Sequence, residues 1–151
     1  MNCWLLKSEP DVFSISDLER RPGSTEHWDG VRNYQARNYL RRMQRGDQAF
    51  FYHSSCAVPG IAGIVSIVRE SYPDFTACDP RSPYHDPAST PDKPRWYMVD
   101  VRHVRTFSRV IGLQELKRCP ALAGMPLLMR GTRLSVMPVT AEQWAAILAL
   151  E

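Results

Sequence analysis

The chain has 151 residues, of which 44% are hydrophobic and 23% charged; this composition indicates one folded domain over residues 1–151 and excludes a disordered chain. The formal net charge of +3 is too small to indicate a nucleic-acid-binding protein by itself. No apolar run approaches the ~20 residues of a membrane-spanning helix, and the first residues lack the basic start and apolar stretch of a signal peptide, so we expect a cytoplasmic protein without a membrane partner.

The cysteines do not form a recognisable metal or disulfide pattern. They stand at positions 3, 56, 78 and 119, and no two have the spacing of zinc ligands. We therefore expect free thiols in a reducing compartment, no metal and no cofactor. The oligomeric state stays open.

A first strand is predicted at Cys3–Leu6, where the residues are apolar and strand-forming. It is expected to stop before Pro10, which has no amide hydrogen and restricts the residue before it. The polar side chains of Lys7, Ser8 and Glu9 lie at this strand end. Two interpretations stay open, the edge of a functional site or an exposed strand exit with a loose Lys7/Glu9 pair.

A capping box is predicted at Ser14 and Asp17, whose spacing lets each side chain bond the other's backbone amide. A short helix should follow through about Glu19. The sequence at 21–24, Arg-Pro-Gly-Ser, is typical of a loop.

The stretch Trp28–Met43 carries most of the functional information. Asp29-Gly30 is a turn pair, and Asn33 can cap the helix that follows it. The apolar face of that helix is predicted from four residues spaced at helical intervals: Ala36, Tyr39, Leu40 and Met43.

Five arginines and no acidic residue lie between Gly30 and Gly46: Arg32, Arg37, Arg41, Arg42 and Arg45. The last four are predicted on a second helix face, because three of them are four residues apart. Like charges at that spacing repel by a few tenths of a kcal/mol per pair. Contact with phosphate would offset this repulsion; a solvated face is the alternative.

Two neighbouring strands are predicted at Gln48–His53 and Ile61–Arg69. The connection between them is too long for a tight hairpin and has His53 and Ser54 at its mouth. Gly63, inside the second strand, predicts a bulge or a close backbone approach.

The segment 70–94 is predicted to be a long loop, because it contains six prolines and four aspartates. So long an irregular segment is either functional or mobile. Asp79, His85 and Asp86 do not match a known metal-ligand spacing, so we expect a solvated loop.

The last third of the chain predicts a strand at 95–107 with a period of two, a short helix at 113–118 and a final strand at 132–139. Thr140 and Gln143 form another capping box before a closing helix. Strands with inserted helices and no regular βαβ alternation favour an α+β fold. The specific expectation is a mixed β-barrel of about five to six strands flanked by short helices.

Several segments, in order over essentially the whole chain, resemble an EVE domain: Trp4–Pro10, Trp28–Asn38, Phe51–Ser54, Tyr72–Asp74 and Arg133–Trp144. The resemblance implies a PUA-like barrel similar to the YTH and ASCH domains. It also implies a non-catalytic module that recognises a modified base, such as methylated cytosine, in DNA or RNA.

Carried over to this sequence, the resemblance implies a base pocket made of Ser8, Glu9, Trp28, Val31, Arg32, Asn33, His53 and Ser54. It would place flanking phosphates on Arg37, Arg41, Arg42 and Arg45. The residue types suit this role. An extruded base needs an aromatic surface, on which stacking is worth roughly 1–3 kcal/mol, and hydrogen-bonding groups for its pairing edge.

Two other functions stay open. A hydrolase of modified nucleosides, as in ASCH-like relatives, could use Lys7 and Glu9 as base and acid if burial shifted their pKa values. His53 and Ser54 resemble a base and nucleophile only if the strand has ended before them, because neighbours on a strand face opposite ways. A protein-interaction domain would instead present the arginine-rich helix to an acidic partner.

Overall fold

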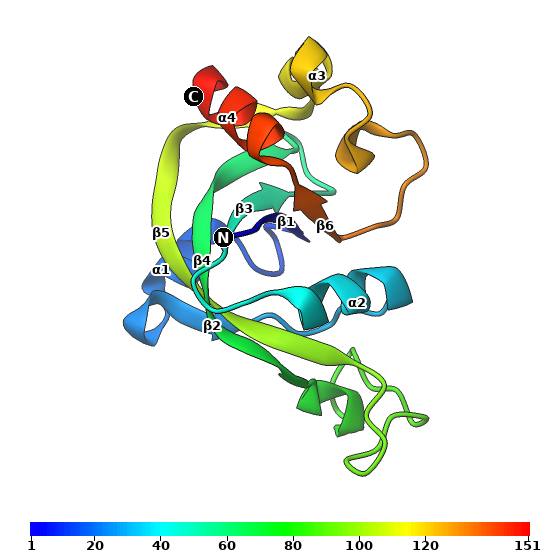
Figure 1. Ribbon diagram of the computed structural model, residues 1–151. Helices are drawn as coiled ribbons and strands as arrows, with labels where there is room; N and C mark the ends of the chain where they lie inside the picture. Colours follow the sequence, from blue (N-terminus) through cyan, green and yellow to red (C-terminus); the bar gives the residue numbers. More distant parts are fainter.

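The computed structural model describes residues 1–151 and consists of one curved sheet with four helices around it (Figure 1). The strands are β1 (Cys3–Ser8), β2 (Thr25–His27), β3 (Gln48–His53), β4 (Gly60–Pro73), β5 (Tyr97–Gly112) and β6 (Val136–Val139). The helices are α1 (Ile15–Arg20), α2 (Tyr34–Arg42), α3 (Leu113–Lys117) and α4 (Ala141–Leu150). Short 3-10 turns lie at Pro22–Ser24, Phe75–Cys78, Pro120–Leu122 and Pro126–Leu128.

The six strands are hydrogen-bonded in the order β2-β5-β4-β3-β1-β6. β1 and β3 are parallel, and every other neighbouring pair is antiparallel. The long strands β4 and β5 bend strongly (Figure 1), and their pairing shifts register at several points. The α+β class and the mixed sheet are confirmed. The sheet is an open strip and not a closed barrel, because the edge strands β2 and β6 do not pair.

Several element boundaries differ from the sequence-based expectation. β4 continues to Pro73 and β5 to Gly112, because each supplies the other with a partner over its whole length. The final strand begins only at Val136, since only the last four residues pair with β1. The sequence does not predict β2, because three residues are too few to show a hydrophobic period. This strand forms through its pairing with β5.

The core covers both faces of the central strands β1 and β3, where consecutive residues, which point to opposite faces, are buried. Its largest fully buried side chains include Leu5 and Leu6 of β1 and Phe50 and Phe51 of β3. The predicted helix caps are present: Ser14 and Thr140 each form a capping box, and the side chain of Asn33 accepts from the amide of Ala36. No helix is long and apolar enough to cross a membrane.

A buried carboxylate fixes the end of α2 to the sheet. Asp47 is 2% exposed and accepts hydrogen bonds from the indole of Trp4 at 3.0 Å and the amide of Gln44 at 2.9 Å. It also accepts from the amide of Asn2 at 3.1 Å. A buried charge is tolerated when its oxygens are hydrogen-bonded in this way, so the sheet and the α2 stretch form one rigid frame.

Gly63 allows β4 to pass close to its neighbours, as the sequence predicts. The register of β4 shifts beside it on both sides of the strand. A Cβ atom at this position would overlap the carbonyl oxygen of Arg105 and the terminal methyl group of Ile15. The glycine is therefore required by packing and not by a left-handed backbone.

We expect Gly63→Ala to lower the free energy of unfolding by about 1–3 kcal/mol, the usual range for overpacking a core. Chemical denaturation measures this value. Gly112→Ala is the matched control, because a Cβ there meets nothing nearer than 3.9 Å. Equal stability of the two variants would contradict the steric account.

Candidate functional site

The polar ends of β1 and β3 lie side by side. The strands are parallel with Ser8 opposite His53, so their carboxyl ends meet at the same edge of the sheet. The amide of Ser54 donates to the carbonyl of Ser8 at 2.9 Å. Residues 45 positions apart in the chain are thus brought to one edge, as the sequence-based hypothesis required.

Trp28 closes the next side of this region. It directly follows β2, and its amide donates to the carbonyl of Val99 at 2.7 Å, which continues the β2–β5 pairing. The side chain packs edge-on against Phe51, with ring centres 5.3 Å apart, and against Phe13 at 6.2 Å. Only 7% of Trp28 is exposed. The same indole therefore belongs to the core and to the wall of a cavity.

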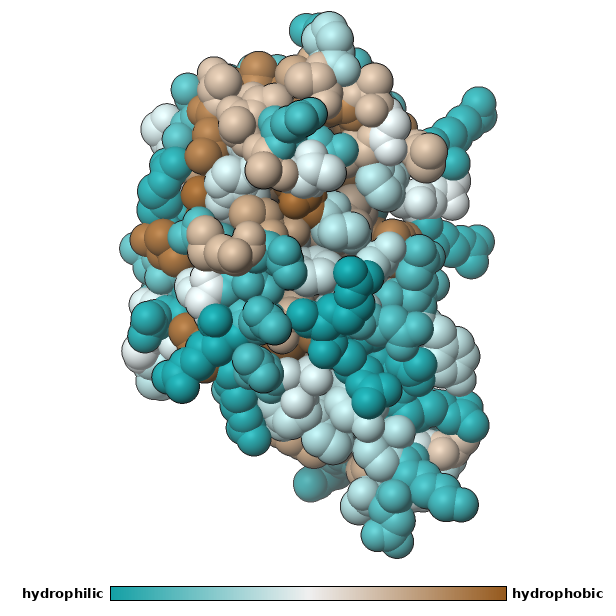
Figure 2. Space-filling model, in the orientation of Figure 1, coloured by the Kyte–Doolittle hydropathy of each residue, from teal (hydrophilic) through white to brown (hydrophobic).

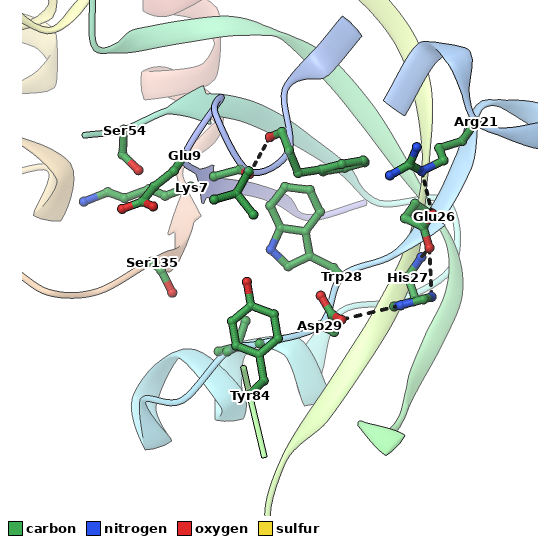
Figure 3. Close-up of a pocket in the computed structure, with 15 residues that line it drawn as sticks. Lys7, Glu9, Arg21, Glu26, His27, Trp28, Asp29, Ser54, Tyr84 and Ser135 are labelled. Carbon is green, nitrogen blue, oxygen red and sulfur yellow. Dashed lines mark hydrogen bonds and ion pairs between the residues drawn. The ribbon is translucent and has the colours of Figure 1, made fainter. Parts of the chain in front are cut away.

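A cavity of about 700 Å³ opens at this point (Figure 3). Five of the predicted base-pocket residues line it: Ser8, Glu9, Trp28, Val31 and Ser54. The other lining residues are Lys7, Val12, Phe13, Arg21, Glu26, His27, Asp29, Gly30, Tyr84 and Ser135. Tyr84 and Ser135 come from segments far along the chain, and no local pattern in the sequence indicates them.

The cavity is lined by charged groups of both signs, of which Lys7 and Glu9 have no ion-pair partner. Lys7 makes no ion pair, and burial lowers the pKa of its amine. Burial raises the pKa of Asp29, although His27 acts against this shift. Lys7 and Glu9 are not paired with each other, so the loose pair considered from the sequence is absent. Unpaired polar groups around one cavity are suited to a ligand that has its own donors and acceptors.

Arg32 does not line the cavity but holds part of its wall. Its guanidinium donates to the carboxylate of Asp74 at 3.0 Å and to the carbonyl of Tyr84 at 2.7 Å. The side chain of Asp74 is fully buried. Burial alone would raise the pKa of Asp74, but hydrogen bonds from Thr76, Gly30 and Arg32 hold it below its usual range.

Asn33 and His53 also lie outside the cavity lining. The side-chain oxygen of Asn33 is used by the cap of α2, at 2.9 Å from the amide of Ala36. Nε2 of His53 accepts from the amide of Ile15 at 3.2 Å, and burial lowers the pKa of this histidine. Both residues therefore support the elements that form the cavity. His53 is neutral and occupied at Nε2, which leaves that nitrogen no role as a base for Ser54.

Most of the segment 74–96 is irregular and exposed, as composition predicted for 70–94, but a few of its residues dock it onto the rest of the molecule. It begins at the buried Asp74, and Asp86 accepts from the indole of Trp96 at 2.7 Å. Tyr84 reaches the cavity and packs over Gly30, where a Cβ would lie 2.7 Å from the Tyr84 ring. Gly30 also has a φ of +77°, which favours glycine. Long-range contacts dock the segment, and composition does not reveal them.

The four arginines proposed to meet phosphate do not share one face. Arg41 lies over the ring of Tyr97 at 4.5 Å, and Arg37 lies over Tyr34 at 4.8 Å and donates to the carbonyl of Arg95. Arg42 lies about 140° around the helix from Arg37, and Arg45 follows the end of α2. They form a broad basic surface around α2 instead of one stripe.

Hydrophilic side chains gather over the part of the molecule where α2 lies, whereas apolar ones gather towards the end that holds α3 and α4 (Figure 2). Arg41, Arg42 and Arg45 are exposed. The surface around α2 is therefore open to an anionic partner.

Comparison with known proteins finds the same fold over nearly the whole chain. The family EVE domain matches residues 2–150. A structure of human THYN1 in complex with 5-methylcytosine-containing DNA is 47% identical, with a TM-score of 0.94, and the match covers 99% of this chain and 97% of that one. A protein from Pseudomonas syringae is 61% identical with a TM-score of 0.95 over 98% of each chain.

Among curated proteins, thymocyte nuclear protein 1 of Homo sapiens is 48% identical over 164 residues, which cover 98% of this chain and 73% of the human protein. An uncharacterized protein of Schizosaccharomyces pombe is 40% identical over 158 residues, which cover 95% of this chain and 66% of the yeast protein.

We expect Arg32→Ala to destabilise the protein by about 3 kcal/mol, because it leaves the buried carboxylate of Asp74 without its charged partner. Chemical denaturation measures the loss, and limited proteolysis should show faster cleavage within 75–95. Arg81→Ala is the control in the same segment; Arg81 is 93% exposed, so its loss should cost less than about 0.5 kcal/mol. Similar behaviour of the two variants would show that Arg32 does not anchor the segment.

Proposed function

The chain belongs to the EVE domain family, and we propose that it is a non-catalytic module that holds a modified base of DNA or RNA, such as 5-methylcytosine, in the cavity beside Trp28. The observation that carries the proposal is the human relative, which binds 5-methylcytosine-containing DNA and matches this chain from end to end at 47% identity. Similarity at that level supports a shared ligand class.

The cavity supports the same conclusion on physical grounds. Its volume of about 700 Å³ falls within the range of about 300–1,000 Å³ that is usual for small-ligand sites. Figure 3 shows the indole nitrogen of Trp28 and the hydroxyl of Tyr84 directed towards the middle of the cavity. A base turned out of its strand requires an apolar wall together with donors and acceptors for its pairing edge.

The proposed contacts follow from the placement of each residue. Ser8, Glu9, Trp28, Val31 and Ser54 would meet the base, whereas Arg32, Asn33 and His53 would act by holding the elements that carry those groups. Arg41, Arg42 and Arg45, with Arg37 at the edge, would contact phosphates flanking the base. A cytoplasmic location remains part of the proposal.

Hydrolysis is the weaker alternative. The neutral amine that burial favours at Lys7 is the one observation that supports it. A nucleophile with an adjacent base is the usual requirement for covalent hydrolysis, and the Nε2 of His53 next to Ser54 is already occupied by the amide of Ile15. Binding without chemistry therefore fits the geometry better.

The first test is a titration of fluorescently labelled duplexes and matched RNAs that carry cytosine, 5-methylcytosine, 5-hydroxymethylcytosine or N6-methyladenine at one position. We expect tighter binding to one modified base than to its unmodified parent. Trp28→Phe keeps the aromatic packing but removes the indole N–H, so it should weaken that binding about fivefold, the effect of losing about 1 kcal/mol.

Trp144→Phe is the matched control, because Trp144 stacks on Phe50 with ring centres 3.9 Å apart and does not line the cavity. Equal affinity for all bases at low salt would exclude a modified-base reader. Equal effects of the two tryptophan variants would remove the Trp28 N–H from the site.

We further expect Arg41→Ala/Arg45→Ala to weaken binding to modified and unmodified strands alike and to reduce the salt slope by about 2, since each phosphate contact contributes about one unit. Mobility shifts at several salt concentrations measure the slope. Lys117→Ala/Arg118→Ala removes the same charge beside α3, away from α2 (Figure 1), and should change the slope less. A loss confined to one modified base would place the two arginines in the pocket instead.

A further inference from the structure

A cavity that recognises methylated cytosine must also exclude thymine. The two bases carry the same methyl group at C5, so an apolar contact with the methyl cannot separate them. They differ at position 4, where cytosine has an amino donor and thymine has an oxygen acceptor, and at N3, which accepts a hydrogen bond in cytosine and donates one in thymine. An acceptor that is fixed beside position 4 therefore separates the two bases.

Asp29 is the acceptor that the fold holds in place. It stands between Trp28, whose amide is bonded to β5, and Gly30, whose amide donates to Asp74 at 3.0 Å. Its backbone is therefore anchored on both sides. No other residue donates a hydrogen bond to its carboxylate within 3.5 Å except His27, whose Nε2 lies 3.5 Å from one oxygen.

The orientation of Asp29 leaves one oxygen for a ligand. Figure 3 shows one carboxylate oxygen facing His27 and the other facing the cavity. His27 is itself held by Glu26, at 2.9 Å from Nδ1, and Glu26 by Arg21 at 3.0 Å. This chain of polar side chains supports Asp29 from behind, while Trp28 and Tyr84 offer an indole N–H and a hydroxyl that have no protein acceptor.

We propose that the carboxylate of Asp29 is the specificity-determining group of the cavity, which accepts a hydrogen bond from the 4-amino group of methylated cytosine and disfavours the 4-oxygen of thymine. The inference rests on the proposed function and names the base class that the site selects. A carboxylate facing a carbonyl oxygen is repelled and loses hydration, so selection against thymine follows from the same group.

Burial supports this assignment. It raises the pKa of Asp29 because the ionised carboxylate is deprived of water, and an amino group from a bound base would supply the missing hydrogen bond. Glu9 is the other acidic residue near the strand ends, but it is exposed and remains hydrated without a ligand. Asp11 is also exposed and does not line the cavity, so Asp11→Asn is the matched control.

The test uses four duplexes that differ at one position, with cytosine, 5-methylcytosine, uracil or thymine opposite an abasic site. No base pair has to be broken in any of them, and the set varies the methyl group independently of the pairing edge, in which position 4 and N3 change together. For the unmodified protein we expect 5-methylcytosine to bind about tenfold more tightly than thymine, within the discrimination that one good base contact provides.

In Asp29→Asn the side-chain amide can either donate or accept. The preference for amino over oxygen at position 4 should fall to about twofold or less, while the preference for a methyl group is kept. Asp29→Ala, which removes the acceptor altogether, should weaken binding of both cytosines and strengthen binding of thymine, because the charge that repels its 4-oxygen is gone. Asp11→Asn removes the same charge at an exposed residue outside the cavity lining and should keep both preferences. Thermal unfolding of each variant verifies its fold.

The outcomes separate this inference from the proposed function. An unmodified protein that binds none of the duplexes, or binds cytosine and 5-methylcytosine equally, contradicts 5-methylcytosine as the base read in DNA and therefore this inference as well. Preference for a methyl group without discrimination between 5-methylcytosine and thymine overturns the role of Asp29 alone. The same conclusion follows if Asp29→Asn and Asp29→Ala both retain the discrimination, or if Asp11→Asn is the variant that loses it.

Discussion

The cavity depends on the buried ion pair between Arg32 and Asp74. A carboxylate with no exposed surface is stable only when its charge is balanced and its oxygens are hydrogen-bonded, and here Arg32, Gly30 and Thr76 meet that need. Arg32 also bonds the carbonyl of Tyr84. One guanidinium thus joins the stretch after β2 to a segment about 50 residues later, and the wall carrying Tyr84 exists because of it.

Trp28 combines two requirements that usually fall on different residues. Its amide extends the pairing with β5, and its ring packs on Phe13 and Phe51. Core packing immobilises the ring before any ligand arrives, so no rotamer entropy is lost on binding. The corresponding cost is that the position cannot change freely, because a smaller residue would leave a space in the core as well as in the cavity.

Features that depend on a few neighbouring residues, such as helix caps, were predicted from the sequence. Ser14, Asn33 and Thr140 cap helices as expected, and the α+β class follows from the order of strands and helices. Ser8 and Ser54 lie together at the ends of the parallel strands β1 and β3, as the family resemblance implied. The family resemblance added a ligand class that no pattern in this chain reveals alone.

Contacts between distant segments could not be predicted. From the sequence, Arg32 is predicted to contact a ligand. In the structure, its guanidinium pairs with the buried carboxylate of Asp74 and holds the wall of the cavity. Tyr84 lies in a proline-rich stretch without periodicity, so nothing local placed it in the cavity. Arg45 continues the four-residue spacing of α2, yet the helix ends at Arg42 because Met43 adopts an extended backbone.

The contact between Gly30 and Tyr84 has a consequence for how such domains can diversify. The segment 74–96 leaves the sheet at the end of β4 and returns at the start of β5, so its length and side chains can change without disturbing the strand order. It nevertheless forms one side of the cavity, through Tyr84. Exchanging this segment between paralogues, with Gly30 and the Arg32–Asp74 ion pair retained, would therefore change which ligand the cavity selects while the sheet stays the same.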